Sequence, residues 1–161
     1  MPKTYEPIAT TTLSAGTATV TFSSIPQTYT DLIVVLNGRT DGDENIRLQF
    51  NSDTTNNYSV IALYGNGSTV TSNFQSNISS IGVGGISSGS DEQGTVIIQI
   101  FNYSNTTTNK TVITRANNST YVQLRTGTRR STQAISTITL TADATTFLSG
   151  ATFTLYGIKA A

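Results

Sequence analysis

The chain's one acidic cluster is the first place where its side chains could do chemistry. The cluster is Asp41-Gly42-Asp43-Glu44-Asn45. Oxygen ligands at alternating positions around a glycine suit Ca²⁺, and an EF-hand loop begins in this way. However, no glutamate follows at the spacing of the last EF-hand ligand, and a strand pattern follows where a helix is needed. Asp41, Asp43 and Glu44 therefore form a weak candidate calcium loop, and we expect a hairpin loop kept soluble by its charges.

The sequence offers few residues of the types that act in catalysis. The sequence contains no histidine, no cysteine and no tryptophan. This excludes Ser-His-Asp and Cys-His catalytic sites, and it removes the usual ligands of transition metals. A glycoside hydrolase needs two carboxyl groups in opposed environments, but nearly all of the nine acidic residues fall in predicted loops. We therefore expect no enzyme activity and no cofactor.

The one basic grouping consists of Arg125, Arg129 and Arg130, with Arg115 upstream. These side chains could pair with the acidic loop of a neighbouring subunit, or they could bind phosphate or a sulfated sugar. They could also form a solvated edge that discourages strand pairing. Because the first role remains open, Arg125, Arg129 and Arg130 are interface candidates.

Four tyrosines could supply flat faces on which a sugar stacks. They are Tyr58, Tyr64, Tyr103 and Tyr121. The alternative is that they are buried or half-buried residues of a β-sheet protein, which is the commoner role for such side chains. We expect Tyr156, near the end of the chain, to lie in the core.

Charge and composition narrow the class of partner. The formal net charge is zero, and charged residues make up 11% of the chain against about 25% in typical globular proteins. Nucleic acids and anionic membrane surfaces attract proteins through concentrated lysine and arginine, so we expect neither as a partner. No apolar run approaches the length of a membrane span, and the first residues show no secretory signal. A neutral chain has little self-repulsion, which favours work in an assembly.

The hydrophobic pattern is that of strands. No segment has an apolar period near that of a helix, whereas alternation with period two recurs along the chain. The predicted strands cover residues 17–22, 31–36, 46–50, 58–64, 94–101, 111–116, 121–126, 134–142 and 152–158. Turn residues such as Gly65-Asn66-Gly67 separate them.

These elements predict an all-β fold, an antiparallel β-sandwich of the jelly-roll kind, in one domain over residues 1–161. About eight to ten strands with closely spaced turns are typical of a sandwich or barrel. Two strands, at 31–36 and 94–101, are apolar on both faces and should be central. Their wide separation in sequence favours Greek-key pairing across two packed sheets.

Two segments lack a clear pattern. Residues 68–93 are rich in Ser, Asn and Gly, and we expect one or two short strands within long loops that face solvent or a partner. Residues 1–7 lack strand periodicity and could form an extended N-terminal arm. Tyr5, between Pro2 and Pro7, could anchor such an arm against another subunit, which makes it a further interface candidate.

Several short segments share features with one class of protein. They are residues 20–32, 48–53, 57–59, 101–104, 134–138 and 147–158. In this order they resemble a recurrent type of small β-sandwich structural protein of tailed bacteriophages. The ending Leu155-Tyr156-Gly157-Ile158, after a glycine-containing turn, is the most specific part of the likeness.

The resemblance implies a role in the virion. It points to a capsid decoration (cement) protein that binds the major capsid protein on the outside of the head, commonly as a homotrimer. The protein would be made in the host cytoplasm, which fits the lack of cysteine. The resemblance equally includes fibre components, so the alternative is a head- or tail-fibre module that binds a host cell-surface glycan.

Overall fold

A computed structural model describes residues 4–42, 45–86, 88, 93–118 and 120–159. These residues form twelve β-strands and no helix, so no helix among them could cross a membrane. In chain order the strands are β1 (Tyr5–Thr12), β2 (Thr19–Phe22), β3 (Asp31–Gly38), β4 (Ile46–Phe50), β5 (Tyr58–Gly65), β6 (Val70–Ile78), β7 (Ile81–Gly84), β8 (Gly94–Phe101), β9 (Lys110–Asn117), β10 (Val122–Arg129), β11 (Ile138–Ala142) and β12 (Thr152–Ile158).

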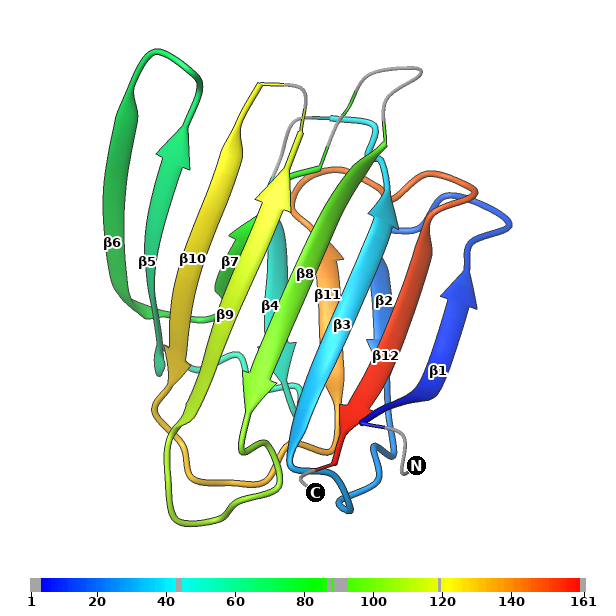
Figure 1. Cartoon of the computed structure of the whole chain (residues 1–161), viewed down its shortest axis with the longest axis vertical. Helices are drawn as coiled ribbons and strands as arrows, with labels where there is room; N and C mark the ends of the chain where they lie inside the picture. Colours follow the sequence, from blue (N-terminus) through cyan, green and yellow to red (C-terminus); the bar gives the residue numbers. More distant parts are fainter. Residues whose placement is uncertain (1–3, 43–44, 87, 89–92, 119, 160–161) are drawn as a thin grey trace.

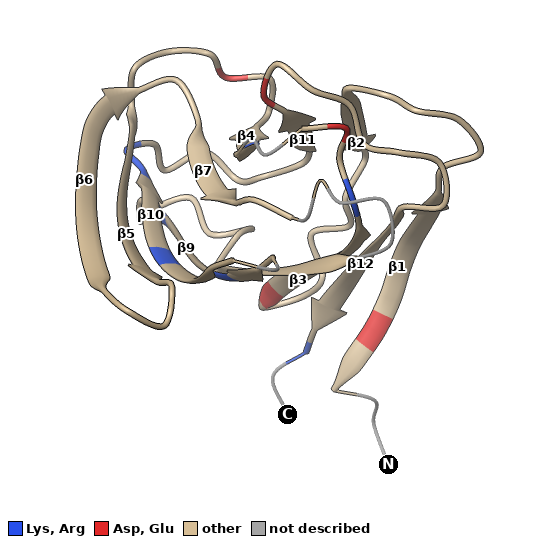
Figure 2. Cartoon of the chain, turned by 90° about the horizontal axis from the view of Figure 1, so that it is seen from above, with Lys and Arg blue, Asp and Glu red and all other residues tan. Residues whose placement is uncertain are grey.

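The strands form two antiparallel sheets that pack face to face (Figure 1). The large sheet has eight strands in the order β1-β12-β3-β8-β9-β10-β5-β6, and the small sheet has four in the order β2-β11-β4-β7. Viewed from above, the large sheet curves around the small one, and β5 and β6 reach beyond its edge (Figure 2).

The strand order is that of a jelly roll with two added hairpins. Without β5–β6 and β9–β10, the eight remaining strands form two sheets of four, β1-β12-β3-β8 and β2-β11-β4-β7. In this arrangement the first and last strands are neighbours, and successive strands alternate between sheets except β4 and β7, which pair within the small sheet, as in a jelly roll. The predicted jelly-roll sandwich is therefore confirmed. The strand count exceeds the prediction because β1 begins in the segment predicted as an arm and residues 68–93 supply two strands, β6 and β7. The two hairpins extend the large sheet, and we call β9, β10, β5 and β6 the extension.

The core lies between the two sheets and follows the predicted alternation. In β2, Val20 and Phe22 are buried while the threonines beside them face out. In β4, Ile46, Leu48 and Phe50 are all fully buried. Alternate side chains of a strand point to opposite faces, so each strand contributes one row to the core.

The two strands predicted to be apolar on both faces, β3 and β8, are neighbours in the centre of the large sheet. Their inner rows are fully buried, for example at Val34 and Ile98. On the outer side Ile33 is buried, but Ile97 and Phe101 are only half-buried. The prediction that β8 is buried on both faces is therefore wrong for its outer row, because nothing among the described residues covers it.

The Ser/Gly-rich middle contains more strand than its sequence pattern indicates. β7 is short, as predicted, whereas β6 has nine residues and pairs along the length of β5. Both faces of β6 are exposed, so its residues are not selected for alternation and leave no pattern. Residues 87 and 89–92 lie outside the described part of the chain.

The structure differs from the predicted N-terminal arm over residues 1–7. Residues 5–7 begin β1 and pair with β12, with Tyr5 opposite Ile158. Glu6 forms an ion pair of 3.0 Å with Lys159 at the other end of the chain. Pro7 hides the strand pattern, yet an edge strand tolerates its missing N–H group. Residues 1–3 lie outside the described residues.

The resemblance motif at residues 155–158 has a packing explanation. A Cβ added to Gly157 would lie 2.3 Å from Cγ of Tyr29, so the tyrosine ring occupies the space of a side chain. The Tyr29 hydroxyl donates to Glu6 over 3.2 Å. Tyr156, expected in the core, instead points to the outer face and is half-buried, because it pairs directly with Ile33.

Candidate functional site

The acidic loop is held by contacts within the chain where the structure describes it. Both carboxylate oxygens of Asp41 accept hydrogen bonds from Thr146, one from the backbone N–H at 2.6 Å and one from the hydroxyl at 2.8 Å. The Thr146 hydrogen bonds hold the pKa of Asp41 below its ordinary value. Asp43 and Glu44 lie outside the described residues. Among the described residues no group of three or more acidic side chains is placed to hold a metal ion.

Arg129 is turned inward and pairs with a carboxylate of its own chain. Its side chain is 3% exposed, and its guanidinium lies 2.8 Å from Asp53. Desolvation raises the pKa of Asp53, but hydrogen bonds from Thr55, Asn57 and Arg129 outweigh it and hold that pKa well below its ordinary value. The interface role predicted for Arg129 stays a prediction that the structure does not favour, because its charge is already neutralised inside the molecule.

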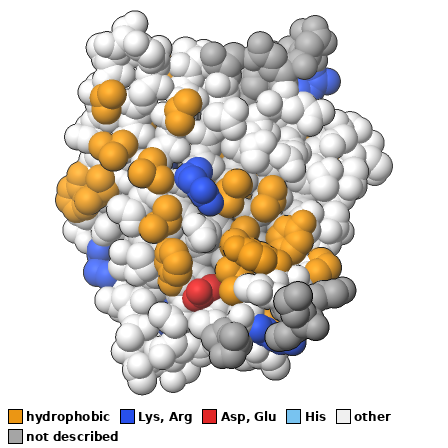
Figure 3. All heavy atoms as spheres, viewed as in Figure 1, with side chains coloured by type: hydrophobic (Ala, Val, Ile, Leu, Met, Phe, Trp, Pro, Cys, Tyr) orange, Lys and Arg blue, Asp and Glu red, His pale blue; other side chains and the backbone are white. Residues whose placement is uncertain are grey.

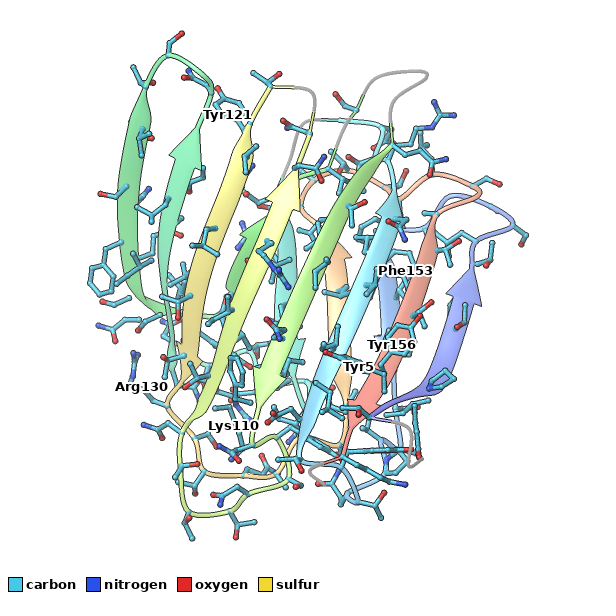
Figure 4. The ribbon with its side chains drawn as sticks, viewed as in Figure 1. Tyr5, Lys110, Tyr121, Arg130, Phe153 and Tyr156 are labelled. Atoms are coloured by element: carbon cyan, nitrogen blue, oxygen red, sulfur yellow. The ribbon has the colours of Figure 1, made fainter. Side chains whose placement is uncertain are left out.

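Lys110 lies directly opposite Arg129 on β9 and is a second buried cation. Its ammonium donates to three backbone carbonyls, those of Asn105, Thr108 and Thr132. Burial lowers the pKa of Lys110, and the charge of Arg129 adds to the effect. Through these contacts the two cations tie the loops at this end of the extension together; Figure 4 shows the position of Lys110.

Arg130 and Tyr5 are the two interface candidates that the structure leaves exposed. Arg130 donates to Ser59, to the carbonyl of Asn56 and to Asn77, so it joins β5 and β6 at the surface. Tyr5 is 56% exposed on β1, at the opposite edge of the large sheet from β6. The structure therefore does not bring these two candidates together (Figure 4).

Of the four tyrosines considered for sugar stacking, two belong to the core. Tyr58 and Tyr103 are fully buried, and desolvation raises the pKa of each phenol. The Tyr58 hydroxyl bonds to the backbone of Phe50, and the Tyr103 hydroxyl donates to the carbonyl of Pro26. Tyr64 and Tyr121, in contrast, line one surface pocket.

That pocket is also lined by Arg125, the third arginine of the basic grouping. It has a volume of about 380 Å³, and its lining includes Tyr64, Tyr121, Asn45 and Gln123. Arg125 points inward from β10 and is only 5% exposed. It is thus a buried residue that lines the pocket, and the interface role predicted for it stays a prediction.

A second candidate surface is the outer side of the extension. Residues directly opposite each other in an antiparallel pair point to the same side of a sheet. Thr126 on β10 lies opposite both Ile113 and Ile61, and Ile61 lies opposite Phe74. Leu124 lies opposite Leu63, and Val122 and Val70 flank Gly65. All the apolar members are exposed, and we call this set the apolar face: Ile61, Leu63, Val70, Phe74, Ile113, Val122 and Leu124.

The apolar face is broad and carries little charge. Figure 3 shows apolar side chains spread over much of the outer side of the large sheet. Arg115 lies among them, opposite Leu124 and Ile97. A hollow of about 370 Å³ is lined by Ile97, Arg115, Val122 and Leu124 among others. A protruding side chain of a partner protein can pack into this hollow.

The outer side of the small sheet is of the opposite character. Thr19 lies opposite Thr141 and Thr21 opposite Thr139, with hydroxyl oxygens 3.4 and 3.3 Å apart. Beside them, Arg47 on β4 pairs with Asp143 at the surface. We call the four threonines the threonine face.

Sequence reasoning missed the apolar face, and it singled out Arg125, Tyr64 and Tyr121 without placing them in one pocket. Ile61, Leu63 and Ile113 alternate with buried residues, so the sequence pattern contains part of the apolar face. Whether these side chains are exposed depends on which side of the large sheet the small sheet covers. The pocket joins Asn45 to Gln123 and Tyr64, residues far apart in sequence. The pairing of β10 with β5 places Gln123 opposite Tyr64, and the packing of the small sheet on the large one brings Asn45, next to β4, to Arg125.

Comparisons with known proteins add little to this geometry. No model of a known protein family matches the chain, and no curated protein matches it. Among solved structures the chain is similar to an exo-inulinase from Aspergillus awamori, with 15% sequence identity and a TM-score of 0.32. The match covers 97% of this chain and 29% of the inulinase, so the chain spans less than a third of that protein. A likeness this weak carries no argument about activity.

Proposed function

We propose that the chain is a virion structural protein, a decoration protein that attaches to the outer surface of a phage capsid through its apolar face. The observation that carries the proposal is that face. Soluble monomers rarely expose a broad contiguous apolar surface, and larger patches mark interaction sites. Here seven large apolar side chains share one side of four adjacent strands, with Val70 and Val122 more than two-thirds exposed.

The contrast between the two outer faces supports a fixed orientation on the capsid. The apolar face loses contact with water when it is covered, which favours binding, whereas the threonine face retains its hydration. The protein would therefore attach with the large sheet against the lattice and the small sheet toward solvent. The major capsid protein is the proposed partner, and no catalytic step is involved.

The resemblance to phage structural proteins supports the same role, and it adds a homotrimer. β6 is an edge strand of nine residues with exposed faces on both sides, and such edges are usually covered or shortened in proteins. A neighbouring subunit would cover it. Three linked copies would bind a lattice more tightly than one, since the second and third attachments become intramolecular.

The test is binding to heads separated from tails. The purified chain is mixed with tail-less heads and, separately, with isolated tails, and the bound fraction is measured after pelleting. We expect saturable binding to heads alone, and a free protein with three times the 17.1 kDa mass of the chain in sedimentation equilibrium. Binding to tails alone, or to neither particle, would contradict the proposal.

A further inference from the structure

The contacts of Arg125 leave its charge uncompensated. Its Nη2 donates to the side-chain oxygens of Asn45 and Gln123, both at 2.7 Å. Its guanidinium carbon lies 5.1 Å from the centre of the Tyr64 ring. These partners are neutral, and no carboxylate of the described residues lies within ion-pair distance of it. Arg129, equally buried four residues later, has Asp53.

Part of the guanidinium is also without a hydrogen-bond acceptor. Nε of Arg125 is buried and has no partner among the described residues. Burying an unpaired donor of a charged group is costly, so such atoms are uncommon unless a ligand, a water or an ion completes them. Burial lowers the pKa of Arg125, an effect that Tyr64 opposes, but an arginine remains protonated in a folded protein.

The pocket beside this cation has the size and lining of a small-molecule site. Its volume of about 380 Å³ lies within the range typical of ligand pockets. Tyr121, directly before β10 and 40% exposed, offers an aromatic face to the pocket (Figure 4). Amide groups of Asn118 and Gln123 and the hydroxyl of Thr120 supply donors and acceptors around it. An aromatic face among amides and hydroxyls suits a sugar ring.

We propose that this pocket binds an acidic sugar unit, with its carboxylate against Arg125 and its ring against Tyr121. A carboxylate matches the planar donors of a guanidinium better than any neutral group. The same charge disfavours a metal ion at this position. A neutral sugar would leave the cation uncompensated, so the pocket selects for charge as well as for the ring.

The pocket does not depend on the proposed capsid attachment. Gln123 and Arg125 point to the inner side of β10, whereas Val122 and Leu124 point to the apolar face. The two surfaces therefore lie on opposite sides of the same strand, and both can be occupied at once. A decoration protein with this pocket would present a site for acidic glycans on the outside of the particle.

The direct test is a titration of the ¹⁵N-labelled protein with D-glucuronate, followed by NMR. We expect shifts of the side-chain amide signals of Asn45 and Gln123. D-Glucose has the ring without the charge, and acetate has the charge without the ring. Each should therefore bind at least about ten-fold more weakly than D-glucuronate. Glucose binding as well as glucuronate, acetate binding as well as glucuronate, or no shift at Asn45 and Gln123 would each overturn the proposal.

Variants locate the site. Arg125→Lys keeps a positive charge but loses the planar donors, and it should weaken glucuronate binding about ten-fold. Because a buried substitution can disturb folding, the second variant is Tyr121→Ala, which changes an exposed residue and should weaken binding without changing stability. Tyr5→Ala, an exposed tyrosine far from the pocket, is the matched control. Equal loss in Tyr5→Ala and Tyr121→Ala would contradict the assignment.

Discussion

The outer faces of the two sheets differ in the kind of surface that they present to water. The threonine face pairs hydroxyl with hydroxyl across β2 and β11. The apolar face places leucine opposite leucine across β5 and β10, at Leu63 and Leu124. A sheet that meets water on one side normally alternates apolar-in and polar-out, and only the small sheet does so throughout.

The inner side of the extension departs from this rule in part, because three cations lie among its buried apolar residues. Lys110, Arg125 and Arg129 point inward, and each has specific oxygen partners. A shift of the pairing by one residue would exchange the two faces and lose all of these contacts. The apolar rows are therefore fixed on the outside by the polar contacts on the inside. Under the proposed function, the extension is the part of the molecule that the partner covers.

The largest effect should separate the core from the apolar face. Ile98→Asp buries an unpaired charge in the centre of the large sheet and should prevent soluble expression, with a cost of several kcal/mol, at least about 3. Leu63→Asp, in the same sheet but 44% exposed on its outer side, should remain soluble and folded. Expression and circular dichroism of the two variants compare them. Equal loss would mean that the apolar face belongs to the chain's own core.

A smaller effect should separate buried from exposed ion pairs. Asp53→Ala leaves Arg129 buried without its partner and should lower the free energy of unfolding by about 3–5 kcal/mol in denaturant titrations. Asp143→Ala, which breaks the exposed pair with Arg47, should cost about 0–1 kcal/mol. Similar losses in both variants would remove the distinction between the inner side of the extension and the surface of the small sheet.

The Asp53 pair also predicts a pH dependence. The pKa of Asp53 is lower in the folded protein than its ordinary value of 3.8. Its contribution to stability is therefore complete above pH 3.8 and is lost as the pH falls from there toward the folded-state pKa. In Asp53→Ala this part of the acid destabilisation should be missing. An unchanged acid limb in thermal melts would show that other carboxyl groups dominate.

The smallest effect concerns two glycines of the large sheet. Gly157→Ala forces a methyl group against Tyr29 and should cost about 1–3 kcal/mol. Gly65→Ala, at the outer end of β5, meets nothing within 4 Å and should change stability by about 0.5 kcal/mol or less. Thermal denaturation resolves the two. A neutral Gly157→Ala would contradict the packing explanation of the Leu-Tyr-Gly-Ile ending.

The sequence predicts the jelly roll well because its core strands alternate. Val20 and Phe22, or Ile46 and Leu48, show their buried side directly in the period of two. β6 leaves no such signal, since no side of it is buried, and Pro7 masks the beginning of β1. These elements become strands through pairing with a neighbour, which is information that a single segment does not hold.

The candidate sites were much less predictable. Arg125, Arg129 and Arg130 are close in sequence, yet β10 turns the first two inward and the third lies beyond the strand. The three side chains differ in burial and in partners. These partners include Asn45 and Asp53, which only the fold brings near. The apolar face follows from alternation in β5, β9 and β10, but its exposure depends on the position of the small sheet.

The most direct test of the account compares two cross-strand pairs on tail-less heads. Leu63→Glu with Leu124→Glu places two charges opposite each other on the apolar face, and Thr21→Glu with Thr139→Glu does the same on the threonine face. Both double variants should stay folded. The account predicts that the first loses head binding by about a hundred-fold or more, while the second binds like the original protein. Loss of binding only in the threonine variant, or equal binding by both, would contradict it.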